Sequence, residues 1–247
     1  MQTAINLFTL RDVEEPLPTV LERVAAAGYD GCEFIHRLPK ADVDAVRSTL
    51  EETGLDVPAA HLAPFTDLDD APEAFDETAE IYDAIGCDTL ALSVGDHHFE
   101  TSADVDETAR KLDALAARLD ERGFDLLYHN HHWEFTELDG RTRFDRLLEA
   151  TDDRIGVELD VGWAAAGGAD PVELIDRLDE RLSIVHVKDV DVDTKTSVEA
   201  GDGDVDLEAC ADAAVDVGVD WLVYEHDEPD DPLESLSRGA SVLSRLD

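Results

Sequence analysis

The stretch "LLYHNHHWEF", residues 126–135, places three histidines directly after a short apolar run. An asparagine, a tryptophan and a glutamate complete the stretch. Imidazole changes its charge near neutral pH and is the commonest protein ligand for transition metals. A cluster of this composition can therefore hold a metal ion or transfer protons.

If the apolar run is a β-strand, alternate side chains lie on the same face. Leu127, His129 and His131 then point together, while Asn130 points the other way. Glu134 follows in the next loop and can reach back over the same point. We predict His129 as a metal ligand and His131 and Glu134 as catalytic residues, although the pattern leaves open which of the three is ligand and which is base.

Three other apolar runs end in residues that bind hard or borderline metals. "LDVGW" supplies Asp160, "VHVKD" supplies His186 and "VYEHD" supplies Glu225. Oxygen and imidazole donors of this kind suit one divalent ion, Mn²⁺, Co²⁺, Mg²⁺ or Zn²⁺. A single acidic residue means little in a chain with 61 of them, but three at successive strand ends predict a metal site. Glu225 is also a candidate catalytic residue.

Further strand-end residues are candidates for contact with a substrate. Lys188 can hydrogen-bond a developing oxyanion, or it can form a salt bridge with Asp160 or Asp189. Trp163 can stack on a sugar face or serve as a packing residue. The residues predicted to bind substrate are Glu33, His61, Asn130 and Trp163.

The chain alternates short β-rich runs with longer amphipathic stretches from end to end, which predicts a single (β/α)₈ TIM barrel over residues 1–247. No glycine-rich phosphate turn follows the first run, as an open doubly wound sheet would require. The predicted strands are 4–8, 31–35, 57–62, 89–94, 125–130, 155–160, 183–188 and 221–226. The predicted helices are 18–28, 42–54, 71–86, 105–123, 143–151, 170–178, 207–218 and 232–246. Barrel enzymes carry their chemistry at the carboxyl ends of the strands, where the candidate residues fall.

The charge of the chain is strongly unbalanced, with 61 acidic against 19 basic residues and a formal net charge of −42. Such an acid excess is typical of a halophilic protein, because concentrated salt screens the self-repulsion. It argues against binding to nucleic acid or to anionic membranes. The amino terminus has no basic leader before an apolar stretch, so we expect a cytoplasmic protein.

The motifs "YHNHHWEF", "ELDVGWAAAGGADP", "SIVHVKDV", "AGDGDVDL" and "YEHDEP" resemble the xylose isomerase-like barrel superfamily. The chain is most similar to its sugar phosphate isomerase/epimerase branch and is also similar to inosose dehydratase. The resemblance implies one divalent metal ion held by Asp160, His186 and Glu225. The chain differs from the family pattern at His129, where better-known epimerases carry a metal-binding, catalytic glutamate.

This resemblance implies an isomerase or epimerase that acts on a keto-sugar or polyol through a metal-stabilised enediolate. Acidic loops after the last two predicted strands favour an unphosphorylated substrate. The main alternative is a lyase or dehydratase acting on a keto-inositol or a 3-keto-glycoside. An endonuclease and a non-catalytic barrel are less favoured, and a homo-oligomer is possible.

Overall fold

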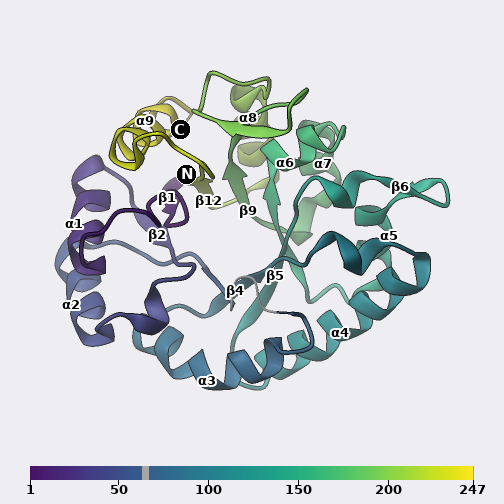
Figure 1. The fold of residues 1–247 in the computed structure, drawn as a ribbon, viewed down its shortest axis with the longest axis horizontal. Coiled ribbons are helices and arrows are strands. Elements are labelled where there is room, and N and C mark those ends of the chain that lie inside the picture. The colour runs from purple at the N-terminus through teal and green to yellow at the C-terminus, as the bar shows by residue number, and fades with distance from the viewer. Residues whose placement is uncertain (63–66, 247) are drawn as a thin grey trace.

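Eight parallel strands form one sheet in the computed structural model, which describes residues 1–62 and 67–246. The strands lie in the order β2-β1-β12-β9-β8-β5-β4-β3. Figure 1 shows them at the centre of a ring of helices. The strands are β1 (Gln2–Asn6), β2 (Gly31–Glu33), β3 (Ala60–His61), β4 (Thr89–Leu92), β5 (Asp125–His129), β8 (Gly156–Asp160), β9 (Leu182–Val187) and β12 (Trp221–Tyr224).

The sheet closes between β2 and β3 through two isolated parallel bridges rather than a continuous ladder. Phe34 pairs with Ala60, and Gly31 pairs with Asp56. The His61 N–H donates to the Phe34 carbonyl at 2.7 Å. We call this junction the seam of the barrel. The predicted TIM barrel is therefore confirmed, with one weakly paired junction.

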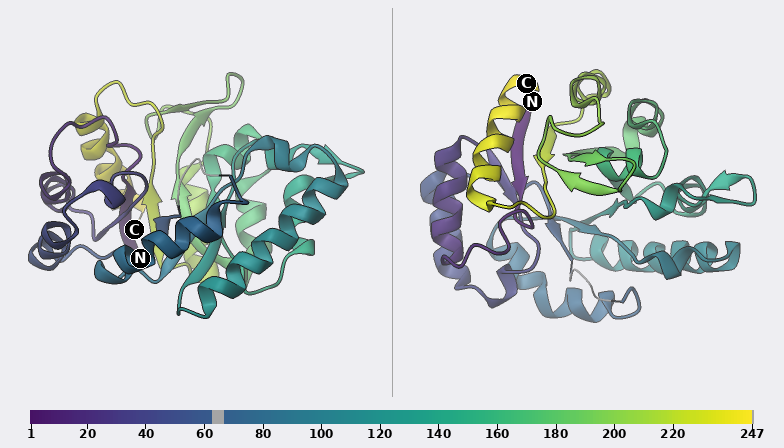
Figure 2. Two further views of the ribbon diagram at one scale, coloured as in Figure 1. Left: turned by 60° about the horizontal axis from the view of Figure 1, so that its bottom comes forward. Right: turned by 45° about the horizontal axis from the view of Figure 1, so that its top comes forward.

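Helices cover the outside of the barrel, and Figure 2 shows this ring in two further views. The helices are α1 (Leu17–Ala27), α2 (Val43–Thr53), α3 (Ala71–Ala84), α4 (Ser102–Asp120), α5 (Arg143–Ala150), α6 (Val161–Ala166), α7 (Pro171–Leu178), α8 (Leu207–Val217) and α9 (Pro232–Leu246). Side-chain caps define several of their starts. Thr101 and Asp104 form a reciprocal capping box on α4, which satisfies two backbone donors that the helix itself leaves free.

Several short elements lie on the loops between strands and helices. Two antiparallel hairpins pair β6 (Glu137–Leu138) with β7 (Arg141–Thr142) and β10 (Asp189–Asp191) with β11 (Thr196–Val198). Single 3₁₀ turns are η1 (Leu38–Lys40), η2 (Asp96–Phe99), η3 (Trp133–Phe135) and η4 (Asp179–Arg181). All of these elements except η4 follow the carboxyl end of a strand, where the candidate residues lie, whereas η4 directly precedes β9.

The predicted bounds of two strands differ most from those in the structure. The first strand covers residues 2–6 rather than 4–8, because the chain turns at Leu7–Arg11 with the Thr9 N–H bonded to the Asn6 carbonyl. The third strand covers only 60–61 rather than 57–62, since Pro58 has no N–H to give to a ladder. Helix α4 begins three residues earlier than predicted, at its capping box.

The barrel interior is layered because every second residue of a strand points inward. An apolar layer consists of Ala4, Ala59, Ala91, Leu127, Ile184 and Val223. Two residues further along β5, β9 and β12, the inward positions are His129, His186 and Glu225. The apolar residues thus form the floor on which a polar layer lies.

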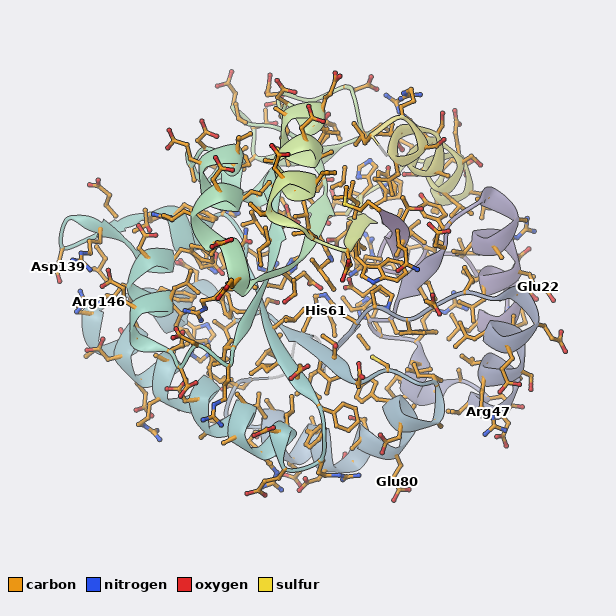
Figure 3. The ribbon with its side chains drawn as sticks, turned by 180° about the vertical axis from the view of Figure 1, so that it is seen from behind. Glu22, Arg47, His61, Glu80, Asp139 and Arg146 are labelled. Carbon is orange, nitrogen blue, oxygen red and sulfur yellow. The ribbon has the colours of Figure 1, made fainter. Side chains whose placement is uncertain are left out.

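Charged side chains cover the outer surface, as Figure 3 shows for examples such as Glu22 and Arg47. Most of the ion pairs there are exposed, and such pairs contribute little stability individually. None of the helices in the described part of the chain has the length and apolar character needed to cross a membrane.

Candidate functional site

Four buried side chains from neighbouring strands meet in the polar layer. His129 comes from β5, Asp160 from β8, His186 from β9 and Glu225 from the residue after β12. Each offers one ligand atom, and these atoms all lie within 4.8 Å of one another. We call these four residues the upper donor set. It contains the four predicted metal ligands.

The upper donor set is suited to a divalent ion by the chemistry of its buried ligand atoms. Asp160 Oδ1 caps α6 by accepting the Trp163 N–H at 2.7 Å. Its second oxygen, Oδ2, is buried and lies 2.9 Å from the Lys188 ammonium, without good hydrogen-bond geometry. A buried carboxylate oxygen of this kind requires a cation or a donor. Two imidazoles and two carboxylates are a fitting ligand set for Mn²⁺, Co²⁺ or Zn²⁺.

Lys188 lies beside this set with almost no exposed surface. Its Nζ is 2.9 Å from Asp160 Oδ2, 3.2 Å from Glu225 Oε2 and 2.8 Å from Asp227 Oδ1. Burial alone would lower the pKa of Lys188, but these carboxylates outweigh it and hold the pKa well above its usual value. The ammonium also lies 4.9 Å from the centre of the Trp163 ring. Asp189, the other predicted partner, instead accepts backbone N–H groups of residues 201–205.

A second layer of ionisable residues lies directly beneath the upper donor set. We call Glu33, His61 and Glu158 the lower layer. His61 Nε2 is 2.8 Å from Glu33 and 3.1 Å from Glu158. Burial opposes charge on His61, yet the two carboxylates raise the pKa of His61 to about 10. The label in Figure 3 marks His61 near the centre of the molecule.

A pocket of about 470 Å³ opens above these layers. It is the size of a small-molecule site and is lined by aromatic rings together with a few polar groups. The lining residues are Phe8, Ile35, His61, Asp67, Ser93, Val94, Gly95, His97, His98, His129, His131, Trp133, Trp163, Lys188, Glu225 and Asp227. A larger hollow of about 610 Å³ lies at the opposite end of the barrel, among residues such as Asp88 and Asp125 that precede or begin strands. The first pocket is the candidate site because it contains the converging donors.

His131 forms one wall of the pocket as part of an aromatic stack. Its ring lies 4.3 Å from that of Trp133, with an angle of 8° between the planes, and 6.3 Å from that of Trp163. Burial lowers the pKa of His131 well below its usual value. A neutral imidazole facing a pocket has a lone pair that can accept a proton, while the same burial disfavours the resulting imidazolium.

Glu134 does not reach into the pocket, contrary to the position expected of it. Its carboxylate accepts the Tyr128 hydroxyl at 2.8 Å and the His131 N–H at 3.0 Å. The side chain is fully buried, and this burial raises the pKa of Glu134 to about 8. Glu134 therefore supports His131 from behind rather than supplying the carboxylate that His129 replaces.

The remaining predicted site residues divide into two groups. His61 and Trp163 line the pocket. Glu33 has no exposed surface and lies under His186, while Asn130 lies on the outward face of its strand. The Asn130 amide donates to the Asp160 carbonyl and accepts the Asp160 N–H, so it fixes that backbone. Glu33 and Asn130 are thus placed behind the pocket.

Two residues with no predicted role also belong to the site. Glu158 lies two positions before Asp160 on β8, so the same alternation that indicates Asp160 could have indicated it. Asp227 lies two positions after Glu225 and lines the pocket. Burial raises the pKa of Asp227 to about 6, even though Lys188 acts in the opposite direction.

A family model described as a xylose isomerase-like TIM barrel matches residues 21–246. An inosose dehydratase of Clostridium perfringens is 24% identical over 195 residues, which are 72% of this chain and 65% of that protein. The match thus spans less than two thirds of that relative's length.

Solved structures extend the similarity to the whole fold. A sugar phosphate isomerase/epimerase from Parabacteroides distasonis superposes with a TM-score of 0.84 at 20% identity, covering 98% of this chain and 93% of that one. The IOLI protein with a bound zinc atom has a TM-score of 0.78 at 17% identity, covering 100% and 98% of the two chains.

Proposed function

The chain belongs to the xylose isomerase-like TIM-barrel family, and from this premise we propose that it is a divalent-metal-dependent isomerase or epimerase of an unphosphorylated keto-sugar or keto-cyclitol. The observation that carries the proposal is the upper donor set at the base of an aromatic-walled pocket. The names of relatives, inosose dehydratase and sugar phosphate isomerase/epimerase, agree with carbohydrate chemistry.

His129, Asp160, His186 and Glu225 would hold the metal ion. When bound, the ion would supply Lewis acidity that makes a C–H beside a substrate carbonyl more acidic. Asp160 is fixed for this task from both sides, since Asn130 holds its backbone and the Trp163 N–H holds one of its oxygens. The position of Asp160 is therefore largely set before any ion binds.

His131 is the proposed base that removes the proton. Its ring is neutral at physiological pH, lines the pocket and is held flat by Trp133. Glu134 fixes the backbone of His131 from behind. Proton transfer by a positioned imidazole contributes roughly 10²- to 10⁴-fold to a rate.

Lys188 lines the pocket among three carboxylates, and it would donate to negative charge on a substrate oxygen in place of one of them. Asp227 beside it, whose pKa is raised to about 6 by burial, can return a proton to the substrate carbon or to a neighbouring carbon. Return to the other face of the same carbon gives epimerisation, and return to the next carbon gives isomerisation.

An unphosphorylated substrate is favoured by the charges around the pocket. Among the described lining residues, Lys188 is the one lysine or arginine, and three carboxylates already surround it. A phosphate group would meet Asp67 and Asp227 without a free cation to balance it. Flat rings such as Trp163 suit the apolar face of a sugar or cyclitol.

A dehydratase is the second candidate, and His129 is the observation that favours it. An epimerase that uses two opposed glutamates lacks one of them here, because Glu134 is turned away from the pocket. Removing a proton and expelling a β-hydroxyl requires one base and one acid, and His131 with Asp227 can supply them. The relative named inosose dehydratase is consistent with this alternative.

The test begins with the metal content of protein purified in concentrated salt without chelator, beside an Asp160→Ala/His186→Ala variant. We expect about one equivalent of Mn, Co, Zn or Mg in the wild type and none in the variant. Keto-sugars and inososes are then incubated in D₂O with the loaded protein. Deuterium entering the substrate would report proton removal, and the product would separate an isomerase from a dehydratase. A wild type without metal and without exchange would contradict the proposal.

We also propose that the protein functions in the cytoplasm of a salt-rich cell, without nucleic acid or membrane partners. The net charge of −42 supports the salt-rich setting and opposes binding to other polyanions. Cys32, Cys87 and Cys210 are free and buried, which suits a reducing compartment. A homo-oligomer stays a prediction.

A further inference from the structure

We propose that Glu33 and Glu158 are positioning residues that select which nitrogen of His186 and of His129 faces the metal ion. The two carboxylates lie under the upper donor set, have no exposed surface and do not line the pocket. They are therefore placed to act on the imidazoles and not on a substrate. This inference rests on the proposed metal site but not on the identity of the reaction.

Glu158 acts on His129 from the neighbouring strand. Its Oε2 lies 2.8 Å from His129 Nδ1, within ordinary hydrogen-bond distance. A carboxylate in this position accepts a proton from Nδ1, so it fixes the tautomer that carries hydrogen there. The lone pair of His129 is then on Nε2, which is the nitrogen left for the metal ion.

Glu33 acts on His186 in the same way from across the barrel. Its Oε2 lies 2.9 Å from His186 Nε2, whereas His186 Nδ1 lies 2.8 Å from Glu225 in the upper donor set. Glu33 thus holds the hydrogen on Nε2 and leaves Nδ1 for the metal ion. The two histidines coordinate through opposite nitrogens because their carboxylate partners lie at opposite ring positions.

Both carboxylates are themselves held in place. The Asn6 side-chain amide donates to Glu33 Oε1 at 2.6 Å. His61 Nε2 lies within ion-pair distance of both Glu33 and Glu158 and joins them. Carboxylates fixed in this manner orient the imidazole rings and increase their basicity toward a metal ion.

A second metal ion is the competing explanation for the same residues. His61, His129, Glu158 and His186 also lie within 4.8 Å of one another and could hold an ion of their own. In that group Glu158 would itself be a ligand, rather than the acceptor of a hydrogen bond from His129 Nδ1. The two explanations predict different stoichiometries, one ion per chain for the positioning role and two for the alternative.

The test measures zinc affinity by chelator competition for the wild type, Glu33→Gln and Glu158→Gln. Glutamine keeps the shape but weakens the acceptor, and we expect a loss of about 10- to 100-fold in affinity for each variant. Glu134→Gln is the matched control, since Glu134 is equally buried and touches no imidazole nitrogen. Its zinc affinity should stay within about threefold of the wild type.

Long-range ¹H–¹⁵N spectra of the zinc-loaded wild type provide a readout that does not depend on activity. We expect zinc on Nε2 of His129 and on Nδ1 of His186, with a proton on the other nitrogen of each ring. Unchanged affinity in both variants, the reversed nitrogens or two zinc ions per chain would overturn the inference while leaving the proposed reaction standing. No zinc binding at all would overturn both, and binding as expected without turnover would overturn the reaction alone.

Discussion

Lys188 Nζ lies 2.9 Å from Asp160 Oδ2 in a place where the lysine side chain is 1% exposed. A buried ammonium is costly unless carboxylates compensate it, and here Asp227 and Glu225 contribute as well. The same lysine faces the pocket, so its charge serves both folding and the site.

Replacing Lys188 with methionine should destabilise the metal-free protein by about 3–5 kcal/mol, because it leaves buried carboxylates without a cation. Denaturant unfolding in concentrated salt measures this change. Added Mn²⁺ or Zn²⁺ should stabilise the variant more than the wild type, since the ion replaces the lost charge. Lys111→Met, which breaks a more exposed pair with Asp69, should cost at most about 1 kcal/mol. Equal losses for both variants would contradict the assignment.

The stability of the protein should depend on pH through Glu134. The pKa of Glu134 is about 8 in the folded protein, above its usual value in an unfolded chain, so the folded state binds the extra proton between these values. The contribution of Glu134 to the free energy of unfolding is fully present below about pH 4 and is lost as the pH rises toward 8. Unfolding free energies of the wild type and Glu134→Gln at pH 5 to 8 should therefore differ in slope, with the wild type losing more stability. Parallel curves would show that Glu134 titrates normally.

His131→Gln should reduce deuterium exchange into a substrate by about 10²-fold or more, if His131 is the base. Metal content should not change, because His131 is outside the upper donor set. His132→Gln is the adjacent control, as His132 does not line the pocket, and its exchange rate should stay within a fewfold of the wild type. Equal rates for the two variants would move the base role to another residue.

The melting temperature should rise steeply with KCl between about 0.2 and 3 M. With 61 acidic and 19 basic residues, the folded chain repels itself at low salt, and screening shortens the range of that repulsion to about 3 Å near 1 M. Thermal unfolding followed by circular dichroism measures the effect. Sucrose at matched osmolality provides the control, since it does not screen charge. A melting temperature independent of KCl would remove the halophilic interpretation.

The barrel could be predicted from the sequence because strands and helices alternate with clear periodicity. The ends of the elements are harder to predict. In β3, Pro58 and the weakly paired seam leave only two residues in the strand. Helix α6 was missed because it has six residues, too few to show a helical pattern. Its N-cap, Asp160, is also a predicted metal ligand, and one side chain can serve both purposes because each of its oxygens has a separate contact.

The candidate site was predictable where strand alternation alone decides direction. Leu127 faces the interior, and His129 and His131 line the pocket as the alternation requires. Glu134 lies beyond the strand end, and its direction depends on the 3₁₀ turn η3 and on the Tyr128 hydroxyl, neither of which a strand pattern can predict. Sequence spacing also cannot tell a ligand from the carboxylate that orients it, as Glu33 shows.

At the seam, local separation of β2 from β3 should depend on whether the metal site is occupied. Few backbone bonds join the two strands, but the side chains of Glu33 and His61 meet across the junction at 2.8 Å. Glu33 in turn contacts His186 of the upper donor set. An ion that immobilises His186 should therefore restrain the junction, and the His61 amide, bonded to Phe34, should exchange its hydrogen with solvent more slowly. Hydrogen exchange at the weakly paired seam should therefore report whether the metal site is occupied.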